Sequence, residues 1–255
     1  MNTTERLARF VVETRLEDIP SPVIARTKEL FVDMIGVAIA GSVMPVTTVL
    51  SRLCREKRCK GEATVIALGY RTSAEDAALI NATALHETEL ESVPMKGVQL
   101  TAMPAFAAIA VGEKFGLSGK DLLEGFILGF ELYGRISLNT PGISARGGWG
   151  GETGIIGAAA TVGKMLKFNV HQMRMAIGLA ASQASGLIEQ GGTNDHVIEM
   201  GIPAGLGIRA ALWAQAGLTS MPDVLEHDKC FCDFYAGEGG YNLENMTANP
   251  GKKYF

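Results

Sequence analysis

The sequence predicts a mainly α-helical domain with one or two short strands. Most apolar residues recur at intervals of three and four positions, over segments long enough to form helices. Apolar residues make up 47% of the 255 positions, but aromatic residues contribute only 7%. Alanine, glycine and methionine supply much of the remainder, and small side chains of this kind allow helices to pack closely. Only one segment, ATVIAL at 63–68, is typical of a strand.

We expect a single domain over residues 1–255, with an irregular tail from about residue 228. The glycine-rich stretches at 147–151 and 191–192 are flanked by helical patterns of the same style, so they indicate loops and not linkers. No internal repeat is evident.

Three helices are predicted in the first quarter of the chain. The pair Ser21-Pro22 is typical of an N-cap followed by proline at the first helical position, and Gly41 is typical of a helix end. The three predicted helices start at Thr3 or Thr4, at Pro22 and at Val46, and they end at Val12, Gly41 and Glu56.

The remaining helices are predicted from caps and periodicity. Ser73, with Asp76 three residues later, is a capping-box-like start for the helix that ends in ALHE. Ser118 caps a helix, and Asn169 or Val170 begins another. The predicted ranges in this part of the chain include 102–115, 120–138 and 201–217, and a glycine-rich loop at 146–154 leads into IIGAAATVGKMLK.

Composition excludes several classes of function. The net charge is −4 and no stripe of Lys and Arg is present, so we expect no nucleic-acid partner. The N-terminus has no apolar signal core and no window reads as a membrane span, so we expect a cytoplasmic protein without a membrane partner. The four cysteines lack the C-x-x-C spacing of a zinc or redox site and are expected to be free thiols: Cys54, Cys59, Cys230 and Cys232.

The first candidate site follows the helix that ends near residue 86. His86, Glu87, Glu89 and Glu91 lie within six positions, and a core helix has no packing reason to end in such a group. The group could bind a cation, move a proton or be solvated at a helix end. If the helix continues, His86 and Glu89 share a face, and a carboxylate beside an imidazole orients it as a base.

The second candidate site combines His196 and Glu199 with Asn194. The first two are also three positions apart, and histidine titrates near neutral pH. The alternative is an ordinary charged helix start. A metal shared with His86 would need a third ligand, which is not evident from spacing, so we predict neither a metal nor a cofactor.

The third candidate site is the glycine-rich loop at 147–154. Glycines before a helix can present backbone N–H groups to an anion such as a carboxylate, whereas simple flexibility is the alternative. Arginine can pair with a carboxylate through two hydrogen bonds, which applies to Arg135 and Arg146. The predicted substrate-binding residues are Arg146, Gly148, Trp149, Gly150, Gly151 and Asn194.

Several ordered motifs resemble those of the MmgE/PrpD family over roughly residues 5–228. NATALHETELES resembles its N-A-x-x-A-H-x-x-D-x-D-D motif, and GIIGAAATVGKMLKFNVHQMRMAIGLAASQASGL is the closest match. The resemblance implies a helical domain, usually followed by a smaller lid domain before which this chain ends. It also implies a homodimer, no organic cofactor, and proton abstraction next to a carboxylate.

The chain departs from the family pattern at positions that the resemblance implies are functional. Glu89 and Glu91 stand where the family has aspartates, and Ser92 stands at the third acidic position. The next family histidine falls near Gln99 or Leu100. His196 takes the place of a lysine, and Gly148 lies near the place of another histidine.

We therefore expect a lyase-like or isomerase-like enzyme that acts on a small di- or tricarboxylic acid. His196 or His86 would be the base, with Glu89, Glu91 and Glu199 orienting it or relaying protons. The alternatives are a catalytically degenerate homologue that binds a second copy or a separate lid chain, and an enzyme repurposed for a reaction such as cyclisation or epimerisation.

Overall fold

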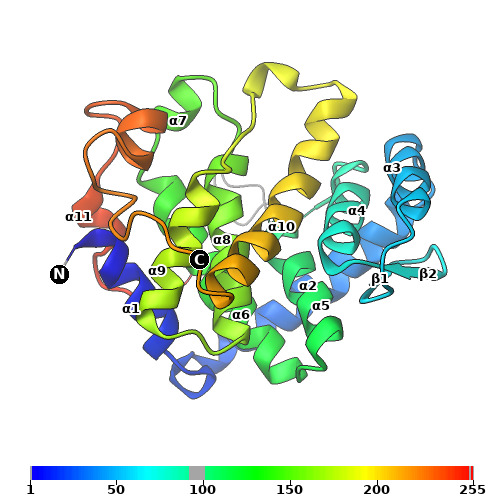
Figure 1. Cartoon of the computed structure of the whole chain (residues 1–255), viewed down its shortest axis with the longest axis horizontal. Helices are drawn as coiled ribbons and strands as arrows, with labels where there is room; N and C mark the ends of the chain where they lie inside the picture. Colours follow the sequence, from blue (N-terminus) through cyan, green and yellow to red (C-terminus); the bar gives the residue numbers. More distant parts are fainter. Residues whose placement is uncertain (1, 92–100, 253, 255) are drawn as a thin grey trace.

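Helices dominate the computed structural model, which describes residues 2–91, 101–252 and 254 (Figure 1). The mainly α-helical class predicted from the sequence is confirmed. The expectations for Ser92, Gln99 and Leu100 lie outside the described residues. The α-helices are α1 (Thr3–Glu13), α2 (Ser21–Gly41), α3 (Pro45–Glu56), α4 (Ala74–His86), α5 (Ala102–Phe115), α6 (Gly119–Leu138), α7 (Gly142–Ala145), α8 (Gly151–Met165), α9 (Val170–Ala181), α10 (Asn194–Gln215) and α11 (Leu243–Met246).

Helix α8 forms the centre of the fold because every one of its residues is buried. It packs against α5, α6, α9 and α10. Glycines make this packing possible: a Cβ on Gly129 of α6 would lie 2.7 Å from the carbonyl oxygen of Gly157. A Cβ on Gly207 of α10 would lie 2.5 Å from the Cβ of Ala158. The small-residue composition therefore serves close helix contacts, as the sequence predicted.

Several predicted helix starts are confirmed by their caps. Ser118 and Asp121 form a reciprocal capping box at α6, and Asn169 forms one with Gln172 at α9. The hydroxyl of Ser73 accepts a hydrogen bond from the Asp76 N–H at the start of α4. These short polar side chains satisfy N–H groups that have no partner within the helix.

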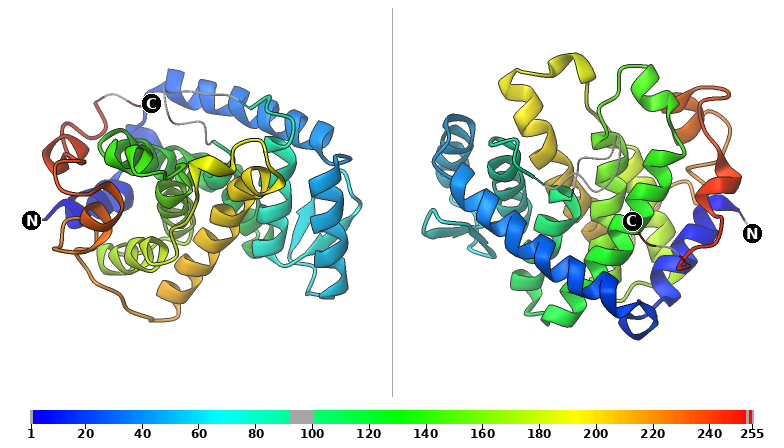
Figure 2. Two further views of the ribbon diagram at one scale, coloured as in Figure 1. Left: turned by 90° about the horizontal axis from the view of Figure 1, so that it is seen from above. Right: turned by 180° about the vertical axis from the view of Figure 1, so that it is seen from behind.

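Helix α2 ends at Gly41 as predicted, but it begins one residue earlier than predicted. It begins at Ser21, with Pro20 as the N-cap, because the Pro20 carbonyl already accepts hydrogen bonds from Val23 and Ile24. Gly41 is the last helical residue and adopts no left-handed conformation. Its role is close approach: a Cβ there would lie 1.7 Å from the Ala84 carbonyl oxygen of α4. Seen from behind, α2 crosses the face of the bundle (Figure 2).

The predicted strand at 63–68 is shorter than expected. Strand β1 (Ala63–Val65) pairs antiparallel with β2 (Tyr70–Thr72), and residues 66–69 form the turn between them. Ala67 and Gly69 both have positive φ in this turn, which ends the extended backbone.

Helix α10 is one continuous helix from Asn194, although the sequence indicated a separate start near residue 201. Its length and composition would allow it to cross a membrane, but 61% of the relevant window is buried inside the fold. The core helix of a helical bundle can have the same length and composition. This feature therefore does not test the expectation that the protein has no membrane partner.

The C-terminal segment has more structure than its sequence pattern indicated. It contains a π-helix, η3 (Cys232–Ala236), which is followed by α11. Two short 3₁₀ helices, η1 (Leu16–Asp18) and η2 (Ile188–Gln190), lie earlier in the chain. Arg135 binds this segment through the carbonyls of Met246 and Ala248, while Glu131 accepts from its Nε at 2.8 Å. Arg135 therefore has a structural role and is not available to a substrate.

The cysteines are free thiols, as predicted. Cys230 precedes the π-helix η3, and Cys232 is its first residue. Burial raises the pKa of Cys54 to about 11 and that of Cys232 to about 12, so neither is a nucleophile at neutral pH.

Candidate functional site

Two helices meet so that their histidines face each other. His86 is the last residue of α4, and His196 is in the first turn of α10. The helices can approach because Gly201 has no side chain: a Cβ there would lie 2.4 Å from the Leu79 carbonyl oxygen. Gly205 has a similar function beside Glu75. Two glycines one turn apart thus bring together histidines that are 110 positions apart in sequence.

The two histidines and two glutamates form a connected group, which we call the histidine cluster: His86, Glu89, Glu91 and His196. The two Nε2 atoms are 3.3 Å apart. Glu89 Oε1 lies 3.1 Å from His196 Nε2 and 3.9 Å from His86 Nε2. The Glu91 carboxylate accepts from Nδ1 of His86. Three of the sequence-predicted residues of the first site, and His196 of the second, are therefore brought together.

The hydrogen-bond partners assign the protons of this cluster. Because the Glu91 carboxylate accepts from His86, the proton of His86 belongs on Nδ1 and its Nε2 carries a lone pair. His196 then donates from Nε2, either to Glu89 or to His86. Its Nδ1 is buried and has no hydrogen-bond partner among the described residues.

The helix ends at His86, so Glu89 does not share a helical face with it as predicted. Glu89 has a left-handed backbone, with a φ of 54°, which turns the chain back over the histidines. Glu87 leaves the group: its carboxylate accepts from the N–H groups of Val46 and Thr47 at 2.7 and 2.8 Å. It caps the start of α3 and has a structural role.

The two residues of the second predicted pair, His196 and Glu199, do not interact as their spacing suggested. His196 and Glu199 are both buried, which excludes the alternative of ordinary surface charges. Glu199 does not orient His196 through a hydrogen bond; its Oε1 accepts from the N–H of Leu187 at 2.7 Å. Burial raises the pKa of Glu199, an effect that this N–H only partly offsets. Asn194 is exposed at the first position of α10.

Buried polar atoms without partners gather around the cluster. Among the described residues they include Nδ1 of His196, Nε1 of Trp149 and Oε2 of both Glu91 and Glu199. The Trp149 ring packs edge-on against His196, with centroids 4.6 Å apart. Buried polar groups are normally satisfied, so a concentration of exceptions is typical of a site that receives a ligand or water.

The glycine-rich loop binds a carboxylate that belongs to the chain itself. Helix α8 already begins at Gly151, so residues 151–154 are helical and not part of the predicted loop. The Gly150 N–H donates to Glu152 Oε2 at 2.8 Å, and the backbone N–H of Trp149 also lowers the pKa of Glu152. Burial outweighs these donors and raises the pKa of that carboxyl. Gly148 is required nearby, because a Cβ there would lie 2.4 Å from Glu152 Oε1.

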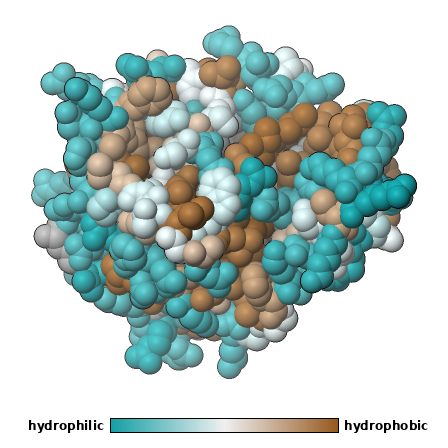
Figure 3. Space-filling view, in the orientation of Figure 1, coloured by the Kyte–Doolittle hydropathy of each residue, from teal (hydrophilic) through white to brown (hydrophobic). Residues whose placement is uncertain are grey.

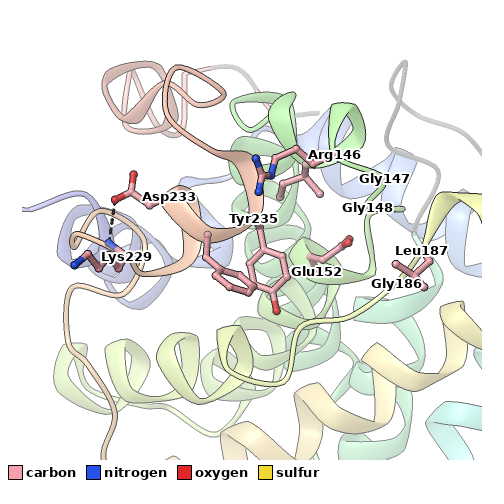
Figure 4. A pocket seen from close by; sticks show the side chains of 11 residues that line it. Arg146, Gly147, Gly148, Glu152, Gly186, Leu187, Lys229, Asp233 and Tyr235 are labelled. Atoms are coloured by element: carbon pink, nitrogen blue, oxygen red, sulfur yellow. Dashed lines mark hydrogen bonds between the residues drawn. The ribbon is translucent and has the colours of Figure 1, made fainter.

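A cavity of about 480 Å³ lies beside this loop, and we call it the arginine cavity. Arg146, Tyr235 and Glu152 lie together at its centre, and Lys229 and Asp233 lie at one side (Figure 4). The sequence analysis missed Lys229 and Tyr235, because the tail that carries them has no regular period. The lining residues are Ile143, Arg146, Gly147, Gly148, Glu152, Gly186, Leu187, Lys229, Asp233, Phe234 and Tyr235.

The arginine cavity and the histidine cluster are neighbours. Leu187 lines the cavity and donates its N–H to Glu199, three residues beyond His196. Gly186 also lines the cavity, and a Cβ on it would lie 3.6 Å from the Cβ of Trp149, whose ring contacts His196. The two regions are thus connected by Trp149 and by the 186–187 segment.

Comparison with known proteins relates the chain to one family and to several proteins of one name. The MmgE/PrpD N-terminal domain matches residues 5–244. Cis-aconitate decarboxylase of Aspergillus terreus is 28% identical over 263 residues, which covers 97% of this chain and 54% of that protein. The Mus musculus and Homo sapiens proteins of the same name are 24% and 27% identical, covering 97% and 91% of this chain and 52% and 50% of their own lengths. The chain spans about half the length of the curated relatives it matches.

Proposed function

The chain belongs to the MmgE/PrpD family, and from that premise we propose that it carries the acid–base part of an active site for a small di- or tricarboxylic acid. The reaction would begin with removal of a proton next to a carboxylate and continue with loss of CO2, loss of water or reprotonation. The similarity to three cis-aconitate decarboxylases supports this substrate class.

The observation that carries the proposal is the pairing of His86 with Glu91. A carboxylate on Nδ1 holds the ring in one tautomer and stabilises the imidazolium that forms when Nε2 takes a proton. His196 lacks such a partner on its Nδ1. Between the two histidines proposed from the sequence, the geometry therefore favours His86 as the base and His196 as the proton donor.

In the first step, His86 Nε2 takes a proton from the substrate carbon and the electron pair of the C–H bond moves into the adjacent carboxylate. His196 keeps its Nε2–H and turns it toward the substrate carboxylate that takes the place of Glu89. His86 is fully buried, whereas the Glu89 side chain is 59% exposed. Displacement of Glu89 by a substrate carboxylate would open the two Nε2 atoms to the substrate.

The arginine cavity would hold a second carboxylate of the acid. Arg146 can donate two parallel hydrogen bonds to it, and Lys229 adds a second positive charge to the lining. Burial raises the pKa of the neighbouring Glu152 carboxyl and backbone N–H groups donate to it, so it opposes an incoming anion less than a free glutamate would.

The test is hydrogen–deuterium exchange at carbon. The protein is incubated in D2O with cis-aconitate and with citrate- and succinate-like acids, and deuteration and CO2 loss are followed by NMR. We expect His86→Gln to lower the exchange rate about 10²- to 10⁴-fold, and His171→Gln, at an exposed histidine, to leave it unchanged. Absence of exchange with every acid in a correctly folded protein would contradict the proposal.

A second candidate function is association with a polypeptide that covers the site. Apolar side chains surround it in exposed positions: Leu90 is 68%, Leu187 60% and Phe234 68% exposed. Apolar residues also gather on the face shown in Figure 3, beside α10. Exposed apolar groups concentrated at a polar site are typical of an interface.

Analytical ultracentrifugation at several concentrations tests this second candidate. A second copy seated on the site would give a dimer that Leu187→Lys dissociates. The matched control is Val32→Lys, which changes an exposed apolar residue of α2. A monomer at all concentrations would contradict self-association and leave a different chain as the covering partner.

A further inference from the structure

Three side-chain atoms of the histidine cluster have the spacing of metal ligands. His86 Nε2, His196 Nε2 and Glu89 Oε1 are separated by 3.1, 3.3 and 3.9 Å. The circle through three points at these separations has a radius of about 2.0 Å, which equals the usual ~2.0–2.1 Å length of Zn–N and Zn–O bonds. One ion at this centre would contact all three atoms without movement of the backbone.

A second observation supports the same interpretation. Metal-binding histidines commonly donate their other ring N–H to a carboxylate, which fixes the tautomer and makes the ligating nitrogen more basic. His86 has this arrangement, because Glu91 accepts from its Nδ1. The Glu91 side chain is almost completely buried, so the carboxylate is held in place and does not depend on a surface rotamer.

Charge and access are also suitable. Two neutral imidazoles and the Glu89 carboxylate carry a charge of −1, and the neighbouring Glu91 balances the remaining charge of a divalent ion. Glu89 is the exposed member of the three, so an ion can enter from solvent on its side. Three protein ligands leave a further coordination position open, as in catalytic and not structural zinc sites.

The composition of the ligand set selects the kind of ion. Two imidazoles and one carboxylate suit divalent first-row transition metals, whereas Mg²⁺ and Ca²⁺ prefer oxygen ligands alone. We propose that His86, Glu89 and His196 bind a divalent transition-metal ion of the zinc class, with Glu91 as the residue that positions His86. The sequence analysis expected no metal because spacing gave no third ligand; the left-handed turn at Glu89 provides it.

The test of this inference is separate from that of the proposed function, since metal binding can be measured without a substrate. The ion would bind the same Nε2 atoms that proton abstraction requires. The metal-bound cluster and the free base are therefore alternative states of one site.

Isothermal titration of the full chain with Zn²⁺ tests the inference, using protein without a histidine tag and freed of metal with EDTA. We expect one ion per chain. Glu89→Gln is the most informative variant, because an exposed side chain can be changed without unfolding the protein. It should weaken binding at least 10-fold, His196→Ala at least 100-fold, and the positioning variant Glu91→Gln about 10- to 100-fold.

Two matched variants control for adventitious binding. His171→Ala changes an exposed histidine and Cys59→Ser an exposed thiol, and both should retain the wild-type affinity. Circular dichroism confirms that each variant is folded. The visible absorption of bound Co²⁺ gives a second readout that His196→Ala should abolish. Failure of the wild type to bind one ion, or an affinity that Glu89→Gln and His196→Ala leave unchanged, would overturn the inference.

Discussion

The histidine cluster and the arginine cavity lie side by side, but they are built in opposite ways. The cluster is assembled from the ends of two long helices, and glycines on α10 fix their approach. The cavity is lined mainly by loops and by the C-terminal segment that contains η3, with one residue each from α7 and α8. Two buried histidines held by packed helices suit proton or metal chemistry, which depends on sub-ångström geometry. An open, cationic cavity suits recognition of an anion.

We therefore expect the histidine cluster to determine the rate of proton exchange and the arginine cavity to determine the affinity for the acid. The assignment can be broken if a change in one region alters the property of the other.

Among changes in the arginine cavity, the largest effect is expected from Arg146→Gln. Loss of a charge-assisted pair of hydrogen bonds should weaken cis-aconitate binding about 10- to 100-fold, measured by isothermal titration. The exchange rate at saturating acid should not change. Arg26→Gln, at an exposed arginine paired with Glu29, is the control. A fall in the saturated rate for Arg146→Gln would show that the two regions do not divide the work in this way.

Gly148→Ala should disturb the cavity without reaching the cluster. The new Cβ would lie 2.4 Å from both Glu152 Oε1 and Ile143 Cγ2. We expect a loss of roughly 1–2 kcal/mol in the free energy of unfolding, measured in urea, together with weaker acid binding. Gly36→Ala is the control, because nothing lies within 4 Å of its Cβ position and alanine in an exposed helix should stabilise by about 0.5–1 kcal/mol. An equally stable Gly148→Ala variant would contradict the close packing.

Glu87→Gln and Glu89→Gln should separate a structural from a functional carboxylate in neighbouring positions. Glu87 accepts from two N–H groups at the start of α3, so its loss of charge should cost about 1 kcal/mol of stability and leave proton exchange unchanged. Glu89→Gln should leave the free energy of unfolding unchanged and alter the rate of proton exchange. Denaturation and D2O exchange on both variants provide the measurements, and similar behaviour of the two would contradict the distinction.

The smallest effect is expected in the pH dependence of stability. Burial raises the pKa of Glu199 in the folded protein, so the folded state holds more protons than the unfolded state above the ordinary carboxyl pKa. Stability contributed by protonated Glu199 is therefore present at low pH and is lost as the pH rises through the folded pKa. In urea unfolding from about pH 4 to 8, the free energy of unfolding of the wild type should fall relative to that of Glu199→Gln. A parallel pair of curves, as expected for the exposed control Glu189→Gln, would contradict it.

Much of the fold could be predicted from local patterns. Ser118 and Asn169 were identified as helix starts, and α5 has the predicted bounds 102–115, because caps and periodicity depend on residues within one or two turns. The short strand was predicted too long, since nothing local revealed that residues 66–69 form a turn. The histidines and acidic residues of the candidate site could be selected from the sequence, but most of their hydrogen-bond partners could not be predicted.

The sequence by itself determined the helical class, the small-residue packing and the residue types available for chemistry, because these follow from composition and from contacts between near neighbours. Only the tertiary structure decided which residues meet. It placed His196 against His86, moved Glu87 to the cap of α3, gave the loop at 146–150 an internal carboxylate, and added Lys229 from the tail. Those outcomes depend on how closely α4 and α10 approach and on where the chain turns after residue 86, which residues distant in sequence decide together.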